Sequence, residues 1–128
     1  MKSRLWLQRA LITLACLGAI GGAVAASASP DPAVDAEEKL DEGLKGFGYL
    51  SGLALGCVAQ EQRKAMEREV MDLGNEIGRL LGTDRAFLYT ASFGYGTSVT
   101  IKTEECREVL SRYEARVAKF RQGSGSKP

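Results

Sequence analysis

Glycine recurs at every fourth position along two stretches that are otherwise predicted to be helical. The two rows are Gly48, Gly52 and Gly56, and Gly74, Gly78 and Gly82. Residues four apart lie on the same side of an α-helix, so each row forms one line along its helix. An interior glycine costs a helix up to about 1 kcal/mol relative to alanine. We therefore expect the rows to serve close helix packing, either with each other or with another tightly packed element.

The spacing of the apolar residues predicts an all-α bundle of three to four helices. The predicted helices cover residues 35–58, 61–81, 84–93 and 103–121. Gly82 and Thr83 mark the second boundary as a C-terminal cap and an N-terminal cap, and Thr103 is expected to cap the last helix. Residues 94–102 are expected to be irregular or extended. A β-hairpin within 86–102 is the alternative, because this stretch contains several residues that favour strands, namely Tyr89, Thr90, Val99, Thr100 and Ile101.

The N-terminal segment has the layout of a secretory signal peptide. Basic residues precede an uncharged run over 10–26, and small residues then provide cleavage patterns ending at Ala25 and Ala28. We expect residues 1–28 to be removed and the protein to be periplasmic or secreted. An uncleaved membrane anchor is the alternative, but the run is short for a membrane span.

About 100 residues remain after this cleavage, which is enough for one domain with a single core. The expected order along the mature chain is an extended lead-in, a helical domain and a flexible tail. Their bounds are 29–34, 35–121 and 122–128.

The mature chain keeps two cysteines, Cys57 and Cys106. In an oxidising compartment an even pair of cysteines predicts a disulfide. A redox or metal site is the rival interpretation. The wide separation, the absence of a CxxC motif and the absence of histidine from the sequence all disfavour it.

The charges of the mature chain are nearly balanced, with 14 basic and 16 acidic residues once Lys2, Arg4 and Arg9 are removed. This balance disfavours nucleic acid as a partner. Segment 31–42 is acidic and segment 107–128 is basic. If the first and last helices pack antiparallel, we expect the acidic start to lie near the basic end, which includes Arg116, Lys119 and Arg121.

The residue types disfavour an enzyme. Without histidine the chain lacks the commonest general base and metal ligand, and no nucleophilic triad can be assembled. The glycines at 94–96 do not match a phosphate-binding loop. We expect no cofactor and no metal. The apolar stretch 46–59 is too short to span a membrane, so we expect the mature chain not to be membrane-spanning.

The best candidate interaction surface falls within 83–103. Arginine and aromatic side chains are enriched at protein interfaces, and this segment has several of them: Arg85, Phe87, Tyr89, Phe93 and Tyr95. The alternative interpretation is that the aromatic rings complete the core of a small domain.

These observations predict a non-catalytic exported helical protein that binds another periplasmic or envelope protein, as an accessory subunit or an inhibitor. A periplasmic acid or stress chaperone is one alternative, because the 16 acidic residues would lose charge at low pH. An immunity protein against an exported toxin is another. The oligomeric state is left open.

Overall fold

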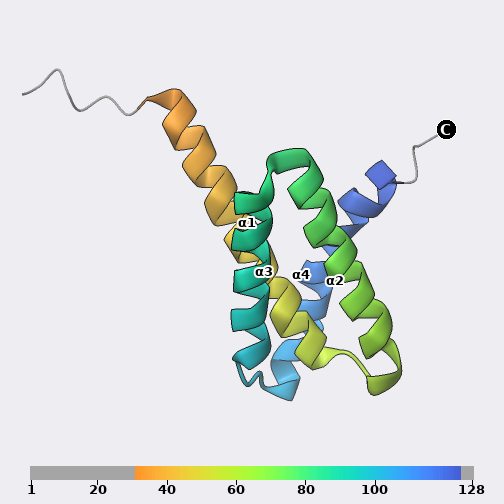
Figure 1. The fold of residues 1–128 in the computed structure, drawn as a ribbon. Helices are drawn as coiled ribbons and strands as arrows, with labels where there is room; N and C mark the ends of the chain where they lie inside the picture. The colour runs from red at the N-terminus through yellow and green to blue at the C-terminus, as the bar shows by residue number, and fades with distance from the viewer. Residues whose placement is uncertain (1–30, 125–128) are drawn as a thin grey trace, which may run out of the picture. The chain divides into compact units, whose positions relative to one another are not determined.

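Four α-helices make up most of residues 31–124, the part of the chain that the computed structural model describes. They are α1 (Pro32–Cys57), α2 (Gln60–Leu81), α3 (Thr83–Ser98) and α4 (Cys106–Ser124), and a 3₁₀ turn, η1 (Thr103–Glu105), precedes α4. These residues contain no strand, which confirms the predicted all-α class. Consecutive helices run in alternating directions, as in an up-and-down bundle (Figure 1).

Several predicted boundaries move. The predicted signal peptide at 1–28 lies outside the described residues, as do residues 29–30 and 125–128. Residues 32–34 were expected to be extended but begin α1. Residues 122–124, expected in the flexible tail, continue α4.

The third helix differs most from its prediction. It extends through Ser98, so the hairpin alternative was wrong, and extended backbone is limited to the link between Val99 and Lys102. The hydroxyl of Ser98 donates to the carbonyl oxygen of Tyr95 at 2.7 Å, which satisfies an acceptor that the helix end leaves open. The hydroxyl of Thr97 donates to the carbonyl oxygen of Gly94 at 2.7 Å. Local strand propensity was overridden by helical packing.

Two of the predicted caps were also wrong. Thr83 and Thr103 are the first residues of α3 and η1, so neither is an N-cap residue. Gly82 is the C-cap of α2, as predicted: its φ of 96° favours glycine, and its N–H donates to the carbonyl oxygen of Gly78 at 3.1 Å.

The core is formed by apolar residues from all four helices. Tyr89 of α3, Tyr113 of α4 and Leu73 of α2 are almost completely buried. The ring of Phe47 of α1 lies 5.4 Å from that of Tyr89 and 6.4 Å from that of Tyr113, measured between centroids. The remaining buried apolar residues are Leu44, Leu50, Ala54, Leu55, Met66, Val70, Ile77, Val109 and Val117.

Helices α1 and α3 meet backbone to backbone. A Cβ atom added at Gly52 would lie 2.7 Å from the Cα of Gly96, and one added at Gly48 would lie 3.1 Å from the amide nitrogen of Phe93. An added Cβ at Gly96 would lie 3.0 Å from the Cα of Gly52. Contacts this short with backbone atoms leave no room for a side chain at these positions.

The other glycines of the two rows have looser surroundings. A Cβ added at Gly74 or Gly78 of α2 would lie 3.4 Å from a side-chain methyl of α3. A Cβ at Gly56 would meet only a methyl at 3.8 Å, and one at Gly82 would meet nothing within 4 Å. That close packing is the reason for these glycines stays a prediction, which substitution can test.

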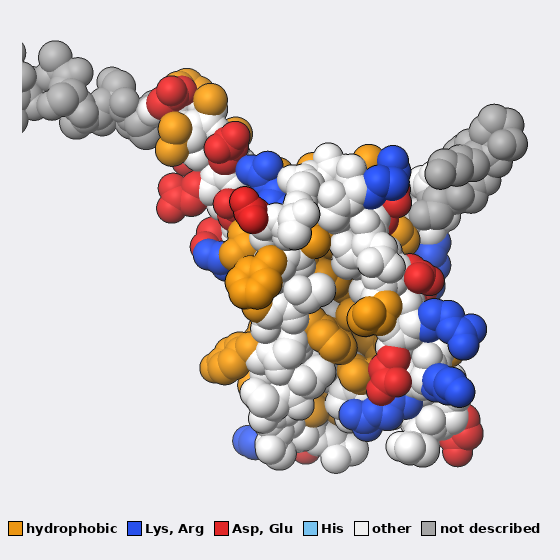
Figure 2. Space-filling model, in the orientation of Figure 1, with side chains coloured by type: hydrophobic (Ala, Val, Ile, Leu, Met, Phe, Trp, Pro, Cys, Tyr) orange, Lys and Arg blue, Asp and Glu red, His pale blue; other side chains and the backbone are white. Residues whose placement is uncertain are grey.

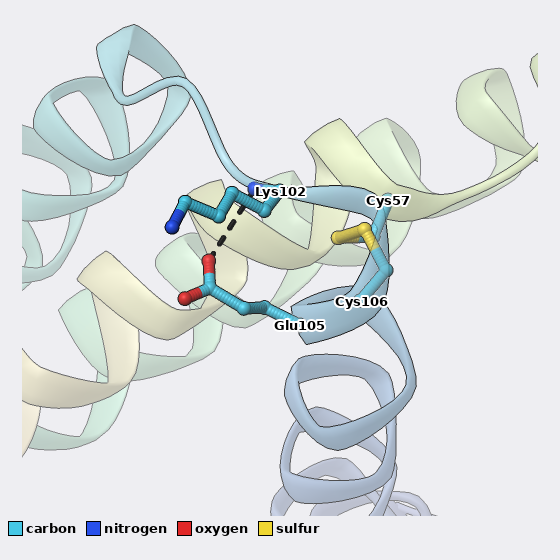
Figure 3. Close-up of a disulfide and its surroundings, with 4 residues drawn as sticks. All are labelled: Cys57, Lys102, Glu105 and Cys106. Atoms are coloured by element: carbon cyan, nitrogen blue, oxygen red, sulfur yellow. Dashed lines mark hydrogen bonds between the residues drawn. A yellow bond between two sulfur atoms is a disulfide. The ribbon is translucent and has the colours of Figure 1, made fainter.

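The predicted disulfide between Cys57 and Cys106 is present and joins the end of α1 to the start of α4 (Figure 3). The Cα atoms are 5.2 Å apart. Just before it, the N–H of Lys102 donates to the carboxylate of Glu105 at 3.3 Å, and the N–H of Glu105 donates to the carbonyl of Lys102 at 3.0 Å. These bonds close the turn that leads into α4.

The acidic start of α1 and the basic end of α4 were expected to lie close together, but the ion pairs between helices join other partners. In α1, Asp41 accepts a hydrogen bond from Arg85 of α3, at 2.9 Å. In α4, Arg121 pairs with Glu69 of α2 and with Glu114 of its own helix, each at 2.9 Å. The expectation was therefore wrong for Asp41 and Arg121, because α2 and α3 supply nearer partners.

Replacing Gly52 by alanine tests the contact between α1 and α3. We expect Gly52→Ala to lower the free energy of unfolding by about 1–3 kcal/mol, the usual cost of overpacking. The matched control is Gly43→Ala on the same helix, where a Cβ meets nothing within 4 Å and helix propensity should add up to about 1 kcal/mol. Urea unfolding followed by circular dichroism measures both. Equal stability of the two variants would contradict the packing role.

Removing the disulfide should destabilise the domain strongly. The bridge spans a sequence separation of 49, and closing a loop of this length contributes about 4 kcal/mol in the chain-entropy model. We expect the Cys57→Ala/Cys106→Ala double variant to show this loss in urea unfolding. An unchanged urea midpoint would show that the bridge constrains little.

Candidate functional site

The outer face of α3 carries a stripe of residues four apart, Phe87, Ala91 and Tyr95, which we call the outer stripe. The side chains of Phe87 and Tyr95 are 68% and 67% exposed, the two highest values among the exposed large hydrophobic residues of the described chain. Three residues at this spacing lie along one line of the helix. Two aromatic rings therefore stand one above the other on the surface, about 12 Å apart along the helix axis.

This face also lacks charge. No Asp, Glu, Lys or Arg occurs between Ala86 and Ile101. Figure 2 shows hydrophobic side chains over α3 and toward α2, whereas the Lys and Arg side chains visible on this side gather mainly over α2. Interface cores are depleted in charged residues and enriched in aromatic ones, so the composition of the outer stripe is typical of a docking surface.

Beside the outer stripe lies an open, mainly apolar hollow of about 480 Å³. Tyr49 of α1 and Tyr95 of α3 stack along it, with ring centroids 5.7 Å apart and planes 28° from parallel. At its edge, the ammonium of Lys45 donates to the carboxylate of Glu42 at 2.8 Å, and this bond raises the pKa of Lys45. The other lining residues are small: Gly46, Ala91 and Ser92.

A second hollow lies at the other end of the stripe, around Phe87. Leu81 and Leu88 give it apolar walls, while acidic side chains from α1 and α3 are also in its lining. One of these acids, Asp41, is paired with Arg85 as described above. The outer stripe thus runs between two hollows, one beside Tyr95 and one beside Phe87.

The structure divides the five residues predicted as an interaction surface. Phe87 and Tyr95 lie on the outer stripe, and Arg85 is partly buried in its pair with Asp41. Tyr89 is fully buried and Phe93 packs against the core. For these two residues the alternative interpretation holds, in which the aromatic rings complete the core. One helix places its aromatic rings on opposite sides.

Sequence reasoning missed the α1 residues that complete the surface, Lys45, Gly46 and Tyr49. Their three- and four-residue spacing places them on one side of α1 and was available as a signal. That this side lies next to Tyr95 depends on how α1 and α3 pack, which the spacing does not specify.

Polar side chains also link the helices, from the buried Tyr89–Ser51 pair to the exposed Arg121. Tyr89 donates to the hydroxyl of Ser51 at 3.2 Å, and Ser51 donates to the carbonyl of Phe47 at 2.9 Å. Tyr113 donates to Glu69 at 2.9 Å, and the same carboxylate accepts two bonds from Arg121, each at 2.9 Å. Every buried side-chain polar atom of the described residues has a partner.

Burial raises the pKa of Tyr89 to about 12, although the bond to Ser51 acts in the opposite direction. Burial, and then the hydrogen bond to Glu69, also raise the pKa of Tyr113 above its usual value. Both phenols are therefore neutral at physiological pH. Their hydrogen bonds to Ser51 and Glu69 connect helices of the bundle.

Within residues 31–124, no group of three or more Cys, Asp or Glu side chains is arranged to hold a metal ion. No helix in this part of the chain is long and apolar enough to cross a membrane. Comparison with protein-family models, with curated proteins and with solved structures finds no match to this chain.

The buried phenols should make the fold sensitive to alkali. Tyr89 has a pKa of about 12 when folded and about 10 when unfolded, so its neutral form stabilises the fold below pH 10. This contribution is lost as the pH rises from 10 toward 12, by about 1 kcal/mol at pH 11.

We expect Tyr89→Phe to reduce the loss of unfolding free energy between pH 8 and pH 11, as measured by urea unfolding. Tyr95→Phe, which changes an exposed ring, is the control and should keep the wild-type pH dependence. Parallel curves for the wild type and Tyr89→Phe would contradict the assignment.

Proposed function

We propose that this protein is a non-catalytic, exported binding protein that docks onto another protein of the cell envelope through the outer stripe of α3. The observation that carries the proposal is the exposure of Phe87 and Tyr95 on a stretch of α3 that has no Asp, Glu, Lys or Arg after Arg85. Aromatic residues at such positions are typical binding hot spots when a partner covers them.

The arrangement favours a docking role over chance exposure. Single exposed apolar side chains are common on protein surfaces and need no explanation. Here two rings share one stripe, and an apolar hollow adjoins one of them. A ring and a neighbouring hollow are the features by which a protein surface anchors a partner side chain.

Export is the second part of the proposal. Its support is the signal-like N-terminal sequence together with the Cys57–Cys106 disulfide, because structural disulfides persist mainly in oxidising compartments. The same disulfide joins α1 to α4, so it keeps α1 and its share of the docking surface in place.

Site-specific photo-crosslinking in the cells that produce the protein tests the docking role. p-Benzoylphenylalanine replaces Phe87 or Tyr95 in turn, and Met71 of α2, which is 63% exposed, is the matched control. We expect one discrete crosslinked envelope protein from positions 87 and 95 and none from position 71. Mass spectrometry of the crosslinked species then identifies the partner.

The outcome separates the candidate roles. An exported toxin as the crosslinked partner would indicate an immunity protein, whereas an envelope enzyme or complex would indicate an inhibitor or accessory subunit. Diffuse crosslinking to many proteins after acidification would favour a stress chaperone instead. The same weak crosslinks from positions 71, 87 and 95 would overturn docking through α3.

A further inference from the structure

We propose that a second copy of this chain occupies the outer stripe of the isolated protein. The two α3 helices would pair antiparallel about a two-fold axis at Ala91. This inference rests on the proposed function, because it names a partner for the same face.

The order of side-chain sizes along the stripe is symmetric about Ala91. A large ring lies four residues before it, at Phe87, and another four residues after it, at Tyr95. In an antiparallel pair centred on Ala91, Phe87 of one copy faces Tyr95 of the other, twice. The small side chain at the centre lets the two helices approach closely where they cross.

Each copy also offers both a projecting ring and a place to receive one. Phe87 is 68% exposed, and the hollow beside Tyr95 is about 480 Å³ and mainly apolar. Ring and hollow lie at opposite ends of one stripe, so a two-fold rotation brings each ring to the hollow of the other copy. An interface that uses the same patch on both subunits has this self-complementary character.

The charge distribution favours a copy of the chain over a charged partner. A two-fold axis places a surface against itself, so any charge near the axis meets its own equivalent and is repelled. The outer stripe carries no such charge. Next to it, Lys45 is paired with Glu42 and Arg85 with Asp41 within the same chain. No charge therefore lies at the axis itself. Glu37 and Asp84 lie at the Phe87 end of the stripe, which the two-fold rotation brings to the Tyr95 end of the other copy, where Lys45 lies.

The expected pairing is weak. Helix α3 has 16 residues and is about 24 Å long. One face of a helix of this length buries less area than the about 800 Å² that each partner buries in a standard interface. We therefore expect a dissociation constant between about 1 μM and 1 mM, which corresponds to about −8 to −4 kcal/mol.

Sedimentation velocity of the purified, disulfide-bonded protein over about 5–1,000 μM tests the pairing. We expect Ala91→Arg and Ala91→Glu each to raise the dissociation constant about 100-fold or more, because each charge would face its own copy. An equimolar mixture of the two variants should associate again, since opposite charges then meet at the axis. Met71→Arg and Met71→Glu are the matched controls, and circular dichroism confirms that each variant is folded.

The outcomes distinguish this inference from the docking role. A wild-type protein that stays monomeric up to about 1 mM would overturn the self-pairing, whereas crosslinks from positions 87 and 95 to a different protein would still support docking. A dimer that Ala91→Arg leaves intact would also overturn it, because the interface would lie elsewhere. A dimer restored only in the mixture places Ala91 on the two-fold axis, whether or not another envelope protein is ever crosslinked.

Discussion

The contact between the backbones of α1 and α3 is the constraint on which the rest of the arrangement depends. Gly48 and Gly52 lie against α3, and Gly96 lies against α1, so close that an added Cβ would overlap backbone atoms. This proximity sets the position of α3 and brings Tyr89 into hydrogen-bonding distance of Ser51. It also places Tyr95 next to Tyr49, which gives the outer surface its stacked pair of rings.

The other links between helices each act at a different place in the bundle. The disulfide joins the end of α1 to the start of α4. The carboxylate of Glu69 holds both Tyr113 and Arg121, and thereby connects α2 to α4. Asp41 and Arg85 connect α1 to α3. Together with the buried rings, these links hold each helix to at least one other, so the proposed docking surface lies on helices rather than on loops.

Helix α3 carries core residues and surface residues that alternate along one segment. Its inward side contributes Tyr89 and Gly96 to the core and to the contact with α1, and its outward side carries Phe87 and Tyr95. Beyond Arg85 neither side carries an Asp, Glu, Lys or Arg, so a hydrophobicity pattern separates them poorly. This explains why the candidate surface predicted from composition contained two exposed rings and two rings that pack in the core.

By itself, the sequence determined the helical class, the disulfide pairing, the C-cap at Gly82 and the absence of histidine chemistry. Each of these follows from local spacing or from residue type alone. Only the tertiary structure decided that α3 continues to Ser98, that Tyr89 is buried while Tyr95 is exposed, and that Lys45, Gly46 and Tyr49 complete the surface. The reason is physical: strand propensity and helical spacing act within one segment, whereas burial depends on which segments of the chain pack against each other.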